Sequence, residues 1–159
     1  MAWLGSASSA ARGPSTAARG TGTVPDELLV PIASDVDVVT ARQQGRSVAA
    51  NAGFSSGDQT VIAAAISELA RNILMYARRG EIALNVITNG DRQGVVIVAR
   101  DQGPGIPDVG RALQDGYSTS GGLGLGLPGA RRLMDEFDVS SVVGKGTTVT
   151  MKKWRQLAS

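Results

Sequence analysis

A carboxylate and a carboxamide, Glu68 and Asn72, stand four residues apart in the segment with the clearest helical periodicity. In a helix this spacing stacks the two side chains on one face, close to the sector that contains Val61 and Ala65. Burial of a charged group is unfavourable unless it has a partner. A bound metal ion, or water held by one, would provide that partner. The alternative is a pair at the edge of the apolar stripe whose side chains reach solvent.

A second candidate is the sequence DQGPG at residues 101–105, which directly follows an apolar strand pattern over residues 95–99. An ionised aspartate accepts hydrogen bonds and never donates them, so an exocyclic amine such as that of adenine is a suitable donor to Asp101. Gly103 and Gly105 permit positive φ angles and close approach to the backbone. The alternative is a capped turn without a binding function, because aspartate and Pro-Gly are common in turns.

A third candidate is the run of alternating glycines from Gly121 to Leu127, which leads into a helical pattern that reaches Met134. Backbone N–H groups at the start of a helix form an anion site, and glycines let a phosphate approach them. The spacing is that of neither a Walker A loop nor a dinucleotide fingerprint. The polar residues 117–120 before it are typical of a flexible lid. The alternative is a plain flexible loop.

The elements that must position these residues follow from the periodicity of the chain. We expect strands over residues 27–32, 81–88, 94–100, 139–143 and 147–154. We expect helices from Ser34 or Asp35 to Ala52, over 58–77, near 108–115, and up to about Phe137. This order predicts an α/β (α+β) two-layer sandwich, with helices on one face of a mostly antiparallel mixed sheet. It lacks the alternation of strands and helices found in dinucleotide-binding domains.

Two local signals support these boundaries. Ser56 and Gln59 have the spacing of a capping box at the start of the long helix. Asn89-Gly90 is a strong signal for a hairpin turn between the second and third strands.

Composition limits the classes of function. The net charge of +2 gives no electrostatic footprint for nucleic acid, and no apolar run approaches the ~20 residues that span a bilayer. The chain has no cysteine and no histidine, which excludes disulfides, thiolate metal sites and phosphohistidine. Residues 1–24 are rich in Ala, Ser, Gly, Thr and Arg and contain no acidic residue, so we expect a disordered tail. The folded domain is expected over residues 25–159, in a cytoplasmic protein.

In order, the three candidate segments resemble the N box and the first and second glycine boxes of the Bergerat-fold (GHKL) ATPase superfamily. Residues 144–148 (GKGTT) resemble its last box, so the resemblance covers residues 29–154. The closest likeness is to the RsbT-type serine/threonine switch kinases, in SELARNILMYARRGEI, GFSSGDQ, GLGLGLPGARRLMDEF and GTTVTMKKW. Related anti-sigma kinases share the boxes, but their N box is usually nearer to E-A-x-x-N-A. The tail is the departure from this family.

The resemblance implies that ATP and Mg²⁺ are bound, with Asn72 as the metal ligand. Glu68 is implied to be the general base, or to orient the attacking hydroxyl. Asp101 is implied to bind adenine, helped through water by Thr147. The remaining residues implied in nucleotide binding are Gly103, Gly105, Ser120, Gly122, Leu123, Gly124, Leu125 and Gly126.

The resemblance also implies protein partners. STAS-domain proteins would be substrates or scaffolds, and a PPM-type serine phosphatase would be activated by the released kinase. Two alternatives stay open: an anti-sigma factor that binds a sigma subunit and phosphorylates an antagonist, and an ATP-dependent binding switch with little kinase activity. Because the chain has no histidine, the acceptor is expected to be a serine or threonine on another chain.

Overall fold

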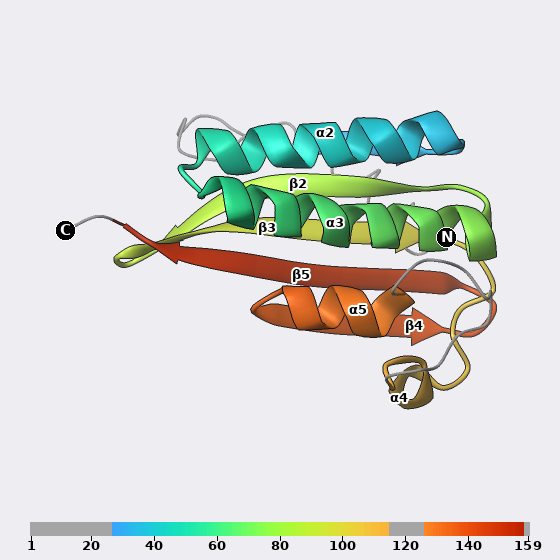
Figure 1. Ribbon diagram of the computed structural model, residues 1–159. Helices are drawn as coiled ribbons and strands as arrows, with labels where there is room; N and C mark the ends of the chain where they lie inside the picture. Colours follow the sequence, from blue (N-terminus) through green and yellow to red (C-terminus); the bar gives the residue numbers. More distant parts are fainter. Residues whose placement is uncertain (1–26, 115–125, 158–159) are drawn as a thin grey trace, which may run out of the picture.

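The computed structural model of the chain describes residues 27–114 and 126–157. These residues form a five-stranded sheet with the strand order β1-β2-β3-β5-β4, and helices α2, α3 and α5 lie on one face of it (Figure 1). Every pair of neighbouring strands is antiparallel. The expected two-layer arrangement is therefore confirmed, and no parallel pair occurs within the described part of the sheet. The predicted tail, residues 1–24, lies outside the described residues.

The strands alternate apolar side chains towards the helices, as a sheet with one covered face requires. Ile82 and Leu84 of β2 and Val95 and Ile97 of β3 are almost fully buried, and they belong to one core cluster with apolar residues of α2 and α3. The strands are β1 Leu28–Ile32, β2 Gly80–Asn89, β3 Arg92–Asp101, β4 Glu136–Val142 and β5 Gly146–Gln156. The helices are α2 Asp35–Asn51, α3 Ser56–Asn72, the π-helical turn η2 Ile73–Ala77, α4 Val109–Ala112 and α5 Gly126–Leu133.

The helix starts agree with the sequence to within two residues. Ser34 precedes α2 as expected, and its backbone N–H donates to the Asp37 carboxylate at 3.1 Å. The predicted cap of α3 at Ser56 is wrong by one position. Ser55 is the cap, and its hydroxyl accepts from the Asp58 N–H at 3.1 Å, which is the third-residue contact of an N-cap.

Two other boundaries also differ from prediction. The last helix was expected to reach Phe137, but α5 ends at Leu133 and Phe137 lies in β4 opposite Met151. The reason is tertiary, because pairing with β5 alternates half-buried and exposed residues along β4. The first hairpin is confirmed with its turn shifted by one residue, since Asn89 pairs with Arg92 and the turn is formed by Gly90 and Asp91.

Helix α3 is the central helix of the fold. Together with η2, the stretch Ser56–Ala77 is long and apolar enough to cross a membrane by length and composition, the one such stretch among the described residues. Half of its apolar window is buried inside the fold, where α3 contacts α2 and α5 and lies over β3. Its hydrophobicity is therefore accounted for by packing within the fold.

Candidate nucleotide-binding site

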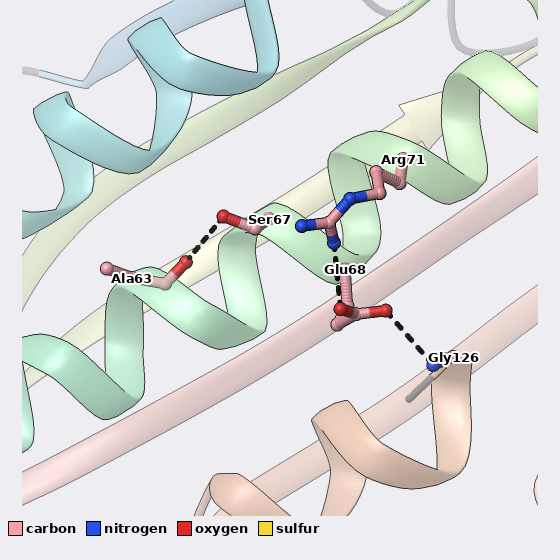
Figure 2. Close-up of polar contacts among 5 residues, drawn as sticks. All are labelled: Ala63, Ser67, Glu68, Arg71 and Gly126. Atoms are coloured by element: carbon pink, nitrogen blue, oxygen red, sulfur yellow. Dashed lines mark hydrogen bonds and ion pairs between the residues drawn. The ribbon is translucent and has the colours of Figure 1, made fainter. Parts of the chain in front are cut away.

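Glu68 is buried on the inner face of α3. It is 9% exposed and is the only charged side chain in the buried set among the described residues. Its Oε2 accepts from the Arg71 guanidinium at 2.8 Å, and its Oε1 accepts from the Gly126 backbone N–H at 3.1 Å (Figure 2). For Glu68, burial contradicts the alternative of a side chain at the edge of the apolar stripe that reaches solvent. The partners of the carboxylate are an arginine and a backbone amide, so its charge is balanced without a metal ion.

Asn72 is the last residue of α3, one helical turn beyond Glu68, and it is half-buried. The helix then widens into η2, and Arg78 at its end has a φ of 73°. Single π-helical turns inside helices are frequent at functional sites. The expected stacking of Glu68 and Asn72 on consecutive turns of one helix is confirmed.

The protein oxygen atoms available here fit a Mg²⁺ ion that is coordinated mainly by a bound ligand rather than by side chains. Across residues 27–114 and 126–157, no group of three or more His, Cys, Asp or Glu side chains could hold a metal ion. Mg²⁺ is commonly bound through one or two protein oxygens together with substrate phosphates and water. The amide oxygen of Asn72 is a hard ligand of this kind.

Asp101 ends β3, between Gly80 of β2 and Thr147 of β5. Its Oδ1 accepts from the Gly103 N–H at 2.8 Å. Burial raises the pKa of the Asp101 carboxyl, while hydrogen bonds from the backbone of Gly103 and Thr147 oppose that rise. The carboxylate therefore lies in a partly desolvated position, as a hydrogen-bond acceptor for a ligand would.

The loop after Asp101 is wedged between two other segments. A Cβ on Gly103 would lie 2.6 Å from the Cβ of Ala77 in η2, and a Cβ on Gly105 would lie 2.5 Å from the carbonyl oxygen of Val142. Gly146 approaches closest, since its Cβ would lie 2.1 Å from the Asp101 carbonyl oxygen. These contacts bring the N-box helix, the first glycine box and the last box together at one end of the sheet.

Ser141 of β4 also belongs to this candidate site, although it is not among the site residues predicted from the sequence. Its hydroxyl accepts from the Ile106 N–H at 2.7 Å and lies 2.9 Å from the hydroxyl of Thr147. It also donates to the Gly146 carbonyl at 3.1 Å. A usable signal existed, because Ser141 is the polar member of the inward-facing series Phe137, Val139, Ser141. This network fixes Thr147 next to Asp101.

The structure describes the predicted phosphate-binding segment only from its last glycine, Gly126. Gly126 begins α5 with a φ of 67°, and its N–H meets Glu68. The second glycine box and the N box are thus in contact. Ser120, Gly122, Leu123, Gly124 and Leu125 lie outside the described residues.

Replacement of Gly105 by alanine is expected to destabilise the fold by about 2–4 kcal/mol. The alanine would have to adopt a left-handed backbone conformation, and its Cβ would clash with the backbone of Val142. Gly144 is the matched control, because its φ of 83° is close to the 81° of Gly105 but its added Cβ would meet nothing within 4 Å. Gly144→Ala should lose only about 1–2 kcal/mol. Urea unfolding of both variants measures the difference, and equal losses would contradict the wedged position of Gly105.

The fold and the clustered boxes define a class of protein. Residues 32–153 match the family described as the histidine kinase-like ATPase domain. A crystal structure of the RsbU and RsbW domains of a Mycobacterium tuberculosis protein has the same fold, with a TM-score of 0.55 and 21% identity over 86% of this chain and 35% of that one. The Pseudomonas aeruginosa SiaB–SiaC complex contains a chain with a TM-score of 0.53 and 15% identity, covering 92% of this chain and 96% of that one.

The curated relatives narrow that class. The serine/threonine-protein kinase RsbT of Bacillus subtilis is 52% identical over 81% of this chain and 97% of its own length. The anti-sigma F factor of Geobacillus stearothermophilus is 35% identical over 62% of this chain and 71% of its own length. The chain therefore belongs to the RsbT family of serine/threonine-protein kinases within the histidine kinase-like ATPases.

Proposed function

We propose that this kinase transfers the γ-phosphate of Mg²⁺-bound ATP to a serine or threonine of a STAS-domain protein. The observation that supports this most directly is the contact between Glu68 and Gly126 at 3.1 Å. It places the one buried carboxylate among the described residues beside a helix N-terminus of the kind that binds phosphate. A hydroxyl brought to the γ-phosphate would therefore lie within reach of that carboxylate.

Phosphoryl transfer depends mainly on positioning of the reactants and neutralisation of phosphate charge, and each site residue has one of these roles. Asp101 accepts from the adenine amine, and Thr147 supports this contact through water. Gly103 and Gly105 let the nucleotide approach the backbone, and Gly126 donates to phosphate. Asn72 would hold Mg²⁺, which neutralises phosphate charge when bound. Glu68 takes the proton from the attacking hydroxyl.

Release from the STAS protein after transfer would free the kinase to activate a PPM-type phosphatase. The second candidate function is that of an anti-sigma factor, favoured by the 35% identity to the anti-sigma F factor of Geobacillus stearothermophilus. Capture of a sigma subunit, rather than of a STAS protein, by the tagged chain in the presence of ATP would favour that second function.

The acceptor is expected to lie on the partner chain. The chain has no histidine, and a folded partner can hold a hydroxyl in line with the γ-phosphate, which accounts for much of the rate of such transfers. Incubation with γ-labelled ATP and a recombinant STAS-domain protein of the same genome should label the STAS protein. The label should survive acid and be lost in alkali, as phosphoserine and phosphothreonine do.

The control for this assay is the same STAS protein with its acceptor serines and threonines replaced by alanine, which should stay unlabelled. Label that accumulates only on the kinase, or label that acid removes, would contradict transfer to a partner hydroxyl.

A further inference from the structure

The two oxygens of Glu68 have different partners. Oε2 forms an ion pair with Arg71, three residues later on α3, whereas Oε1 faces the Gly126 N–H at the start of α5 (Figure 2). The Arg71 side chain is 47% exposed and that of Glu68 is 11% exposed. The arginine therefore reaches the buried carboxylate from the solvent side, and the second oxygen is directed towards the proposed phosphate site.

The ion pair contributes little to folding, because one partner is half exposed and solvent screens it. Its geometric effect is larger. The single charge-assisted hydrogen bond from the Arg71 guanidinium to Oε2, at 2.8 Å, restricts rotation of the carboxylate and keeps Oε1 directed at α5.

We propose that Arg71 is the positioning residue for Glu68, a role that rests on the proposed function of Glu68 as general base. When ATP occupies the site, the Gly126 N–H turns from Oε1 to a phosphate oxygen, and Arg71 alone holds the carboxylate. Oε1 then takes the proton of the acceptor hydroxyl as its oxygen bonds to the γ-phosphorus and the bond to the ADP oxygen breaks.

Arg71→Ala should lower kcat for transfer from ATP to the STAS-domain protein by about 10- to 100-fold, the size of effect expected when a reacting group is misplaced. The KM for ATP, calorimetric affinity for a non-hydrolysable ATP analogue and the midpoint of thermal unfolding should stay close to wild type. Arg71→Lys should recover kcat to within about fivefold of wild type, because lysine restores the charge without the planar fork.

Arg46→Ala is the matched control. Arg46 is an exposed arginine of α2 that donates to the Thr60 hydroxyl of α3 at 3.0 Å, so its loss changes the net charge equally and also removes one contact. This variant should transfer phosphate at the wild-type rate. The double variant Arg71→Ala, Glu68→Gln should be no slower than Glu68→Gln alone, because Arg71 acts through Glu68.

Wild-type kcat in Arg71→Ala, with Glu68→Gln slow, would overturn the positioning role and leave the general base in place. Wild-type kcat in Glu68→Gln itself would instead overturn the proposed function of that carboxylate. A loss in Arg71→Ala confined to the KM for ATP would make Arg71 a nucleotide contact, and would also overturn the positioning role.

Discussion

Replacement of Glu68 by glutamine is expected to slow phosphoryl transfer by about 10²- to 10⁴-fold, the usual contribution of a general base. Glutamine has nearly the same shape and keeps an oxygen that can accept from the Gly126 N–H, which lies 3.1 Å from Oε1. It cannot take the proton of the attacking hydroxyl. Affinity for ATP should stay the same or rise slightly, since a negative charge near the phosphates has been removed. Single-turnover transfer and calorimetry with an ATP analogue measure the two effects separately.

Ser67→Ala provides the control for a change at a buried position of the same helical turn. Ser67 is 3% exposed, and its hydroxyl donates to the Ala63 carbonyl at 3.0 Å (Figure 2). Its loss should alter stability by about 1 kcal/mol or less and leave transfer unchanged. If Glu68→Gln and Ser67→Ala slowed transfer equally, or if Glu68→Gln only unfolded the chain, Glu68 would be a structural residue.

Most of the fold could be predicted because its elements have strong local periodicity. The 3.6-residue period located α2 and α3, and alternation located both hairpins. The segment around Phe137 could not be assigned locally, because Leu133, Met134 and Phe137 also fit a helical stripe. Phe137 is in a strand because it pairs with Met151 of β5, and that pairing is a tertiary interaction.

Sequence patterns could predict those parts of the site whose residues lie on the same helix or strand. Glu68 and Asn72 follow from helical spacing. The contact of Glu68 with Gly126 joins residues 58 positions apart and arises from the packing of α3 against α5. Ser141 likewise became part of the site through the close approach of the loop after Asp101 to the β4–β5 hairpin. Neither contact can be predicted from a local sequence pattern, because each joins elements that are distant in the chain.

Asp101→Asn is expected to weaken ATP binding by roughly 10- to 100-fold. The loss of a hydrogen bond to a charged acceptor amounts to about 1.5–3 kcal/mol. Asparagine keeps an oxygen that can accept from the Gly103 N–H, which lies 2.8 Å from Oδ1, so the loop should retain its conformation. The amide can also present its own NH₂ to the adenine amine, which is a donor. Calorimetry with ATP and with GTP as the control nucleotide tests this, and equal ATP affinity of the two proteins would contradict the adenine contact.

The same substitution should have the opposite effect on the stability of the nucleotide-free protein. Burial raises the pKa of Asp101 above its ordinary value of 3.8, so the folded state binds the proton more tightly than the unfolded state. The resulting stabilisation is fully present below the unfolded pKa and is lost as pH rises through the folded pKa. Above the folded pKa the wild type has an ionised, partly desolvated carboxylate, and Asp101→Asn should be at least as stable there. On acidification towards pH 4, wild type should gain stability relative to the variant. Thermal unfolding of both proteins across this range measures the difference. A wild type that loses stability relative to Asp101→Asn as pH falls would show that the hydrogen bonds from Gly103 and Thr147 outweigh burial.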